Sequence, residues 1–326
     1  MIATNIWFWV GFIAFVLSML ALDLGVFNKR PHVVQPKEAG IWTAVWVGLA
    51  LLFAAGLAYF ATPQVALTFL TGYLIEESLS IDNIFVIVLI FQYFAVPAQF
   101  QHRVLFWGIL GALIMRGIFI GLGTALLARF EWIIYVFGAL LVITGIRMAM
   151  KQDEEFQGDQ NPVVKLVRRI FPLTDGYRGK DFFVIENGKR YATPLMLVLV
   201  LVEATDLIFA VDSIPAIFGI TRDPFIVFTS NIFAVMGLRS LFFLLASVVT
   251  KFHLLKYGLA VILTFVGAKM LLEHWIHIPI MLSLGIVLSV LAASIVASLI
   301  WPNAHQPSEG KTGSMFGRVP PSGGEQ

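Results

Sequence analysis

The sequence contains no cysteine. It therefore cannot form a disulfide, a thiolate metal site or a cysteine nucleophile, and this chain has no thiol-based redox chemistry. Charge is scarce as well, because only 13% of the residues are Asp, Glu, Lys or Arg, whereas soluble domains carry roughly 25%. Any metal ion bound by the chain must meet oxygen, nitrogen or thioether ligands.

Long apolar runs take the place of the missing charge. The chain is 59% hydrophobic and its mean hydropathy is +0.87. A run of about 20 apolar residues is long enough to cross a bilayer as a helix. The sequence predicts an all-α, polytopic membrane protein with about nine transmembrane helices. The predicted spans lie near residues 4–26, 41–61, 65–96, 104–127, 131–150, 193–220, 225–248, 255–273 and 278–301.

Basic residues are distributed unevenly over the predicted connections. Only Arg129 and Arg222 fall on one side of the membrane, whereas most other connecting Lys and Arg residues fall on the opposite side. Because basic connections favour the cytoplasm, we expect the N-terminus outside and the C-terminus in the cytoplasm. The first span lacks the basic start and small-residue cleavage site of a secretory signal, so we expect it to remain as an anchor.

The chain divides into six predicted segments. The connection over 151–192 is the one sizeable soluble loop, and its Asn187-Gly188 pair predicts a short hairpin. The segments are an N-terminal two-helix segment (1–61), a first three-helix repeat (62–150), a cytoplasmic loop (151–192), a second three-helix repeat (193–274), a final transmembrane helix (275–301) and a disordered cytoplasmic tail (302–326).

Two groups of acidic residues interrupt apolar spans. A carboxylate in the bilayer interior costs a few kcal/mol or more unless it is paired, hydrated or liganded, so such residues are candidates for function. The first group is Glu76, Glu77 and Asp82 with Asn83, and the second is Glu203, Asp206 and Asp212 with Ser213.

The two groups repeat each other. Glu76 and Asp82 are six residues apart, as are Asp206 and Asp212. Each group is followed in the next span by one arginine, and the third spans also match. The corresponding residues are Asn83 and Ser213, Arg116 and Arg239, and Tyr135 and Tyr257. Because each unit has three spans, the repeat is predicted to be inverted, with an acidic midplane site where the units meet.

The repeat also ranks the adjacent glutamates. Glu76 corresponds to Asp206, whereas Glu77 corresponds to Leu207. Glu77 is therefore expected to be peripheral, and Glu76 to belong to the site.

Helix geometry limits how these carboxylates can converge. Residues six apart on a straight helix point about 240° apart, so Asp206 and Asp212 cannot aim at one ion. Glu203 and Asp206, three apart, share a face. Convergence of the full set requires local unwinding. The candidate break points are Gly72, Ser78, Ser80 and Pro215.

Carboxylates with amide and hydroxyl groups are typical ligands of hard divalent cations such as Mn²⁺, Mg²⁺ and Ca²⁺. The predicted ligands are Glu76, Asp82, Asn83, Glu203, Asp206 and Asp212, with Glu77, Ser213, Arg116 and Arg239 in support. Crowding and desolvation disfavour the ionised carboxyls, so exchange of the cation for protons is a natural mechanism. No other cofactor is expected.

Other interpretations of the same residues are open. Arg116 and Arg239 can neutralise some acids in ion pairs that only hold helices together, although the acids outnumber them. Glu273, His274 and His277 form a weaker cluster at the outer end of the eighth span, either interfacial or an exit-side ion station. An intramembrane aspartyl protease needs only two acids sharing a proton, fewer than are present.

No nucleophile elbow, Walker loop, HExxH motif or dinucleotide fingerprint stands on a suitable element, so we expect a protein that is not an enzyme. The net charge of +2 gives no nucleic-acid footprint. The expected partners are a divalent metal ion as substrate and the lipid bilayer, with a homo-oligomer or other membrane proteins left open.

Three motifs resemble the TerC family of integral membrane proteins, and within it a pH-responsive bacterial subgroup, over residues 1–301. They are Leu74 to Phe85 with Glu76, Asp82 and Asn83, then Glu203 to Phe218 with Asp206 and Asp212, and then Asp223 to Asn231 with Gly237-Leu238-Arg239. The resemblance implies the same six site residues.

The resemblance also implies a function. It implies manganese export across the cytoplasmic (inner) membrane for metal homeostasis, and a link to tellurium resistance. A cysteine-free acidic site should repel a tellurite oxyanion, so we interpret that phenotype as indirect. Plastid relatives resemble factors that assemble membrane proteins, which leaves a biogenesis or scaffold role as the alternative to transport.

Overall fold

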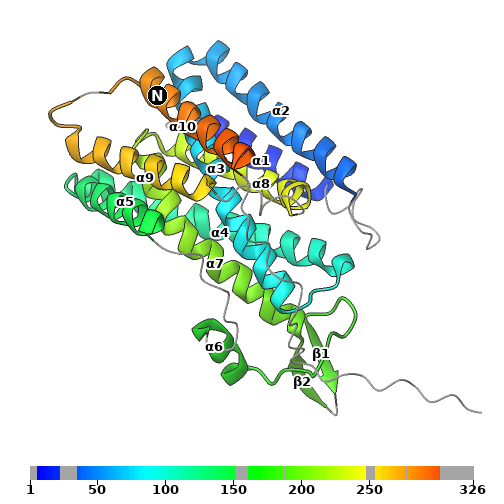
Figure 1. Cartoon of the computed structure of the whole chain (residues 1–326). Coiled ribbons are helices and arrows are strands. Elements are labelled where there is room, and N and C mark those ends of the chain that lie inside the picture. The colour runs from blue at the N-terminus through cyan, green and yellow to red at the C-terminus, as the bar shows by residue number, and fades with distance from the viewer. Residues whose placement is uncertain are drawn as a thin grey trace, which may run out of the picture.

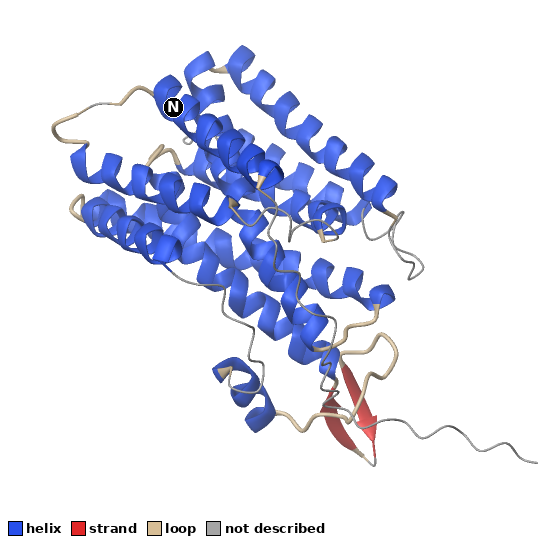
Figure 2. Cartoon of the chain, in the orientation of Figure 1, coloured by secondary structure: helices blue, strands red, loops and turns tan. Residues whose placement is uncertain are grey.

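The computed structural model describes residues 6–22, 35–150, 161–186, 188–246, 254–276 and 278–301. Within these ranges the chain forms ten helices and one two-stranded sheet (Figures 1 and 2). The helices are α1 (Ile6–Leu22), α2 (Pro36–Phe60), α3 (Pro63–Tyr93), α4 (Ala98–Arg129), α5 (Ile133–Met150), α6 (Pro162–Ile170), α7 (Pro194–Phe218), α8 (Pro224–Leu245), α9 (Leu255–Leu272) and α10 (Ile280–Ile300).

The fold is that of an all-α polytopic membrane protein. Among the described residues, seven helices are long and apolar enough to cross a membrane: α2, α4, α5 and α7 to α10. The two other predicted spans also contain long helices. However, α1 has only 17 described residues, and α3 carries Glu76, Glu77 and Asp82. The predicted disordered tail beyond residue 301 lies outside the described residues.

Proline marks the start of many of these helices. Five begin with a proline in the first turn, where the missing N–H group is not needed. Three of them gain a side-chain cap as well, among them α6, where Asn161 Oδ1 accepts a hydrogen bond of 2.8 Å from Val163 N. The Thr62 hydroxyl accepts a hydrogen bond from Val65 N, and Asp223 Oδ1 accepts one from Phe225 N at 2.9 Å.

Four helices form a central bundle. Helix α3 packs against α7 and α8, and α4 packs against the same two helices, so α3 and α4 lie on one diagonal of the bundle. Helix α5 packs on α9, and α10 packs on α9 and α3. Helix α2 packs on α8 and α3. The central bundle (α3, α4, α7 and α8) is therefore enclosed by apolar helices on more than one side (Figure 1).

Aromatic packing holds the N-terminal helices against this bundle. Phe12 of α1 lies 6.0 Å from Phe225 of α8, measured between ring centroids. Phe53 of α2 lies 5.0 Å from both Phe69 of α3 and Phe233 of α8. Such edge-on and tilted pairs add to the burial of apolar surface in fixing α1 and α2.

The described part of the 151–192 connection docks on one end of the bundle, where α6 and β2 contact α7 (Figure 2). The predicted hairpin is confirmed by strands β1 (Phe183–Glu186) and β2 (Lys189–Ala192), which are antiparallel. Gly188 has φ of 76° in the turn, and Asn187 lies outside the described residues. Tyr177 donates a hydrogen bond of 2.8 Å to the Phe94 carbonyl. Burial raises the pKa of the Tyr177 phenol, so it remains a donor.

The predicted unwinding of the acidic helices is wrong. Helix α3 is continuous through Gly72, Ser78 and Ser80, and α7 is continuous through Pro215 to Phe218. The Ser78 hydroxyl donates to the Leu74 carbonyl within its own helix, so it does not interrupt the backbone ladder. Pro215 lies in the last turn of α7, where the loss of one hydrogen bond is tolerated.

Helices α5 and α9 cross closely at two glycines. A Cβ atom on Gly145 would lie 2.7 Å from Ala260 O, and a Cβ atom on Gly267 would lie 2.6 Å from Gly138 O. The contacts run in opposite directions along the two helices, so α5 and α9 are antiparallel. Only glycine allows these backbones to approach so closely.

We predict that Gly267→Ala destabilises the protein because its Cβ would overlap the Gly138 carbonyl. The melting temperature in detergent, followed by tryptophan fluorescence, should fall by several degrees. Gly121→Ala is the control, because nothing lies within 4 Å of its Cβ position. In a helix interior the control should be neutral or slightly stabilising. Equal melting temperatures for the two variants would contradict the close crossing.

Candidate functional site

A buried arginine joins two of the predicted site residues inside the central bundle. Arg116 of α4 is 2% exposed, Glu76 of α3 is 1% exposed and Asp206 of α7 is 4% exposed. Arg116 Nη1 pairs with Glu76 Oε1. Arg116 Nη2 donates to Asp206 Oδ1 at 2.9 Å, and Arg116 Nε donates to Asp206 Oδ2 at 3.2 Å. The guanidinium thus holds Asp206 in a two-point contact and reaches α3 with its remaining arm.

Asn83 completes this cluster. Its Nδ2 donates a hydrogen bond of 3.0 Å to Asp206 Oδ1, and the side chain is 2% exposed. The structure therefore brings together Glu76, Asn83 and Asp206 around Arg116. We call these four residues the arginine cluster. Two buried carboxylates surround one buried cation, and Glu76 Oε2 and Asn83 Oδ1 have no hydrogen-bond partner among the described residues.

Asp212 lies apart from the arginine cluster, because it is six residues after Asp206 on a continuous helix. Its Oδ1 accepts a hydrogen bond of 3.0 Å from Thr144 Oγ1 on α5. It also lines an apolar groove between α5 and α7, with Tyr135 and Arg147. Because α7 is a continuous helix, the side chain of Asp212 points away from that of Asp206, as the spacing of six residues predicted.

Glu203 does share a face with the cluster side of α7, as its spacing from Asp206 predicted. Its carboxyl group packs against Gly111 of α4, where a Cβ atom would overlap it. Glu203 Oε2 is buried without a hydrogen-bond partner in the described part of the chain. Gly111 was not selected from the sequence, and only the packing reveals that it makes room for this carboxyl group.

The other predicted residues take less central positions. Asp82 and Arg239 are partly buried. Glu77 is also partly buried, although its Oε2 is enclosed and makes no hydrogen bond to a described residue. Ser213 is 1% exposed, and its hydroxyl has no partner within the described ranges.

The six predicted ligands do not assemble into a metal site in this conformation. Among the described residues, no three Asp, Glu or His side chains gather closely enough to hold a metal ion. The reason is visible in the arginine cluster, where the guanidinium lies between the two carboxylates that converge most closely. Arg116 is itself the cation that these two carboxylates contact, and it offers them N–H donors.

Asn231 was used in the sequence analysis only as part of a family motif. It is 0% exposed on α8, and neither Oδ1 nor Nδ2 makes a hydrogen bond to a described residue. A buried amide without partners is rare in folded proteins. The polar run Thr229-Ser230-Asn231 inside an apolar helix was the available signal, but sequence alone does not give its burial.

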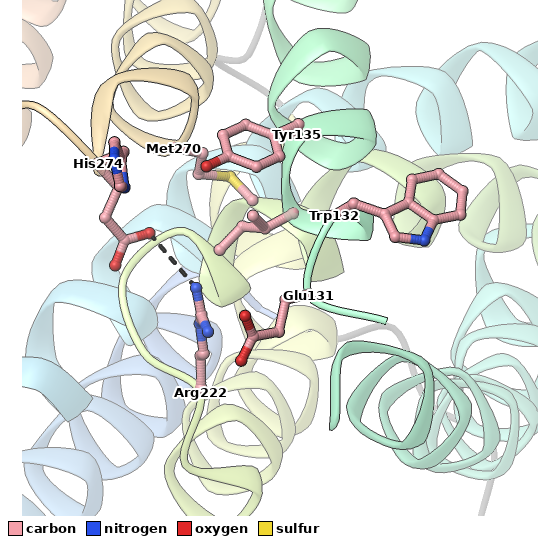
Figure 3. Close-up of a pocket in the computed structure, with 8 residues that line it drawn as sticks. Glu131, Trp132, Tyr135, Arg222, Met270 and His274 are labelled. Atoms are coloured by element: carbon pink, nitrogen blue, oxygen red, sulfur yellow. Dashed lines mark ion pairs between the residues drawn. The ribbon is translucent and has the colours of Figure 1, made fainter. Parts of the chain in front are cut away.

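A separate pocket of about 430 Å³ lies where α5 begins, α7 joins α8 and α9 ends (Figure 3). Arg222 and Glu273 form an ion pair of 3.7 Å in it, and Glu131 and His274 also line it. Both partners of the pair are about half exposed, so the pair contributes little stability. The predicted His277 of this cluster lies outside the described residues.

Comparison with known proteins gives a family and several relatives. The model of the integral membrane protein TerC family matches residues 61–306. An uncharacterised membrane protein of Myxococcus xanthus is 55% identical over 300 residues, covering 92% of this chain and 94% of that protein. Alx of Escherichia coli K12, which carries the provisional name of a membrane-bound redox modulator, is 50% identical over 305 residues, covering 90% and 94% respectively. No solved structure matches the chain.

We predict that Arg116→Met strongly destabilises the protein, because it leaves Glu76 and Asp206 buried without a cation. Breaking a buried pair in this way lowers the free energy of unfolding by about 3–5 kcal/mol. Neutralising the carboxylates in the same chain, with Glu76→Gln and Asp206→Asn, should recover most of the loss. Thermal unfolding in detergent measures both effects.

Arg178→Met is the matched control for this prediction. Arg178 also pairs with a glutamate, Glu186 at 2.8 Å, but both side chains are exposed. This variant should leave the melting temperature unchanged. A triple variant no more stable than Arg116→Met alone would show that unpaired buried charge is not the cause of the loss.

Proposed function

The chain belongs to the TerC family of integral membrane proteins, and we propose that it exports a hard divalent cation, manganese(II), across the cytoplasmic membrane. The observation that carries this proposal is the arginine cluster. Two carboxylates converge on one cation inside a bundle enclosed by apolar helices. Ionisable groups buried in this way are expensive, and in membrane proteins they mark ion pathways.

The chemistry of the cluster favours a hard cation. Its available ligands are carboxylate and amide oxygens of Glu76, Asn83 and Asp206, and the chain has no thiolate. Oxygen ligands suit Mn²⁺, Mg²⁺ and Ca²⁺, whereas softer metals prefer sulfur or several imidazoles. The family resemblance selects manganese among the hard cations.

Arg116 acts in this mechanism as an internal substitute for the substrate. In the conformation described here its guanidinium neutralises Glu76 and Asp206. An entering divalent cation displaces the guanidinium, since both compete for the same oxygens. When the cation leaves, the Arg116 guanidinium returns to the carboxylates. The carboxylates therefore always have a positively charged partner in their apolar environment. Protons can serve the same purpose, which makes cation–proton exchange the proposed coupling.

The inverted repeat is part of the proposal, and helix packing supports it. In the third spans, corresponding residues are 257 − 135 = 122 positions apart, as Tyr135 and Tyr257 are. Gly145 therefore corresponds to Gly267, and Gly138 corresponds to Ala260. The contact of Gly145 with Ala260 and that of Gly267 with Gly138 are then the same contact made twice, with nearly equal distances. Because α5 and α9 are antiparallel, the relation between the units is one of opposite polarity.

The nine-span topology is likewise proposed. Under it, α1 and α3 cross the membrane together with the seven apolar helices, so the two termini lie on opposite sides. The bias of basic residues toward the cytoplasm then favours an N-terminus outside. The loop with α6, β1 and β2 then lies in the cytoplasm, where its basic residues are favoured. Under this topology, the pocket at Arg222 and Glu273 faces the outside.

The name of the Alx relatives points to redox state, but this chain has no cysteine with which to exchange disulfides. Under the proposed function, a redox effect follows from the export of a redox-active metal ion. A role in membrane-protein assembly is the alternative outcome of the experiment below, because an assembly factor has no need of a charged metal-binding cluster.

We predict that the protein lowers cellular manganese when it is expressed in a manganese-sensitive bacterium that lacks its exporters. Asp206→Asn and Glu76→Gln should abolish most of this effect, because each removes a charge and a ligand from the cluster. Losing one charged ligand worth about 1.5–3 kcal/mol corresponds to a roughly tenfold or larger loss of affinity. Elemental mass spectrometry of cells at matched membrane abundance gives the readout.

Asp175→Asn is the control, because Asp175 is an exposed aspartate of the soluble loop. It should export manganese as the wild type does. Asp82→Asn and Asp212→Asn, also predicted as ligands, extend the test to carboxylates outside the arginine cluster. Wild-type protein that leaves manganese unchanged, or cluster variants that match it, would reject the exporter and favour the assembly role.

The proposed orientation can be tested by cysteine labelling. Because the chain has no native cysteine, an introduced cysteine is its only reactive thiol. Lys180→Cys lies in the soluble loop and Arg222→Cys lies at the opposite end, and both positions are exposed. A membrane-impermeant maleimide should label Cys at position 222 in intact cells, and the cysteine at position 180 only after permeabilisation. The reverse pattern would invert the topology and the inferred direction of export.

A further inference from the structure

Asn231 is the least explained polar residue in the central bundle. Its side chain is fully enclosed, and neither amide atom has a partner among the described residues. Its neighbours on α8 differ in this respect. Ser230 Oγ donates to the Ile226 carbonyl at 2.8 Å, and Thr229 Oγ1 donates to the same carbonyl at 3.4 Å. The adjacent hydroxyls are thus satisfied by their own helix, and only the amide is left to bind something else.

Helix packing brings Asn231 to the level of Arg116. A Cβ atom on Gly117 of α4 would lie 3.6 Å from the Phe228 ring of α8. Further along both helices, Val235 of α8 packs with Ala112 of α4. The two helices are therefore antiparallel, and Asn231 lies between Phe228 and Val235 on one stripe of α8. That stripe faces the turn of α4 that carries Arg116.

Two further oxygens without partners come from the neighbouring helices at the same level. Asn83 of α3 bonds Asp206 of α7, and Gly72 of α3 lies against Ile217 of α7, so α3 and α7 run antiparallel. The same register sets Glu76 opposite Ser213. Glu76 Oε2 and Ser213 Oγ are both buried, and neither makes a hydrogen bond to a described residue.

Helix α8 comes within one turn of this level through Ser230. Its Oγ lies 3.0 Å from the position of a Cβ atom on Gly72, one turn before Glu76. Three helices of the central bundle thus contribute unpartnered oxygens near Arg116, and three of these atoms are Glu76 Oε2, Ser213 Oγ and Asn231 Oδ1.

We propose that Asn231 Oδ1 is a ligand of the transported divalent cation, at a position shared with Glu76 Oε2 and Ser213 Oγ. This inference rests on the proposed export function and adds a residue to its site. One charged and two neutral oxygens suit a hard cation and bind it less tightly than several carboxylates. A transported ion must be bound strongly enough to enter and weakly enough to leave.

A ligand and a structural amide respond oppositely to the same substitution. If Asn231 is a cation ligand, Asn231→Leu replaces an unsatisfied amide with an apolar side chain of similar size. The cation-free protein then keeps or gains stability. The same change removes a ligand and weakens cation binding. If Asn231 instead holds helices together, Asn231→Leu destabilises the cation-free protein and leaves cation binding unaffected.

The experiment measures melting temperature in detergent against MnCl₂ concentration, each variant being compared with its own metal-free value. Wild type should be stabilised by Mn²⁺. Asn231→Leu should melt no lower than wild type without metal and need at least about tenfold more Mn²⁺ for half of the shift. Ser230→Ala is the matched control, because this neighbour on α8 has its hydroxyl satisfied within the helix, and it should respond as wild type does.

Asn231→Asp supplies a second readout if Asn231→Leu does not fold. It keeps an oxygen at the position and adds charge, so it should lower the Mn²⁺ concentration needed for half of the shift. If Asn231→Leu folds and needs the same Mn²⁺ concentration as wild type for half of the shift, the inference is overturned. If Asn231→Leu does not fold, the same result in Asn231→Asp overturns it.

The outcome also separates this inference from the proposed function. Wild-type protein that Mn²⁺ does not stabilise would overturn both. A wild type that responds, with a response lost in Asp206→Asn but intact in Asn231→Leu, would overturn the role of Asn231 alone.

Discussion

The arrangement of the central bundle depends on one buried cation between two buried carboxylates. Arg116 must reach from α4 across the bundle to Glu76 of α3, and it must hold Asp206 of α7 in a two-point contact at the same time. Without this cation, a charge on either carboxylate would be buried and uncompensated. The register of three helices is thereby fixed by charge, in surroundings where apolar packing alone distinguishes one register from another only weakly.

Stability alone does not account for the charges in the arginine cluster. A hydrophobic replacement of a buried ion pair is often neutral or stabilising, so stability alone gives no reason for charges at this position. A tethered guanidinium has a further property that a fixed apolar contact lacks: it can leave and return, because the side chain is long and its charge is constant. The surrounding unpartnered oxygens of Glu76, Ser213 and Asn231 are consistent with a second occupant of the bundle.

The sequence predicted much of this, but only where composition or spacing carries the information. The helices match the predicted spans because apolar length is a one-dimensional property, and the hairpin followed from its turn residues. Glu76, Asn83 and Asp206 were selected by their cost in an apolar helix, and the structure joins them. The prediction of unwinding at Ser78 and Ser80 was wrong, because α3 continues through both residues. Asn231 and Gly111 escaped selection because burial and facing partners depend on which helices pack together.

The proposed repeat also predicts a hydrogen bond that the arginine cluster does not make. Under it, the hydrogen bond from Asn83 to Asp206 has a counterpart from Ser213 to Glu76, and that counterpart is not made although both oxygens are buried at the same level. Arg116 likewise bridges both carboxylates from one unit. An exact twofold arrangement would satisfy the two halves equally, so under the proposed repeat and the proposed export this imbalance is expected of one of two related conformations. Exchange between them would move the unsatisfied oxygens from one side of the cluster to the other, as alternating access to a midplane cation requires.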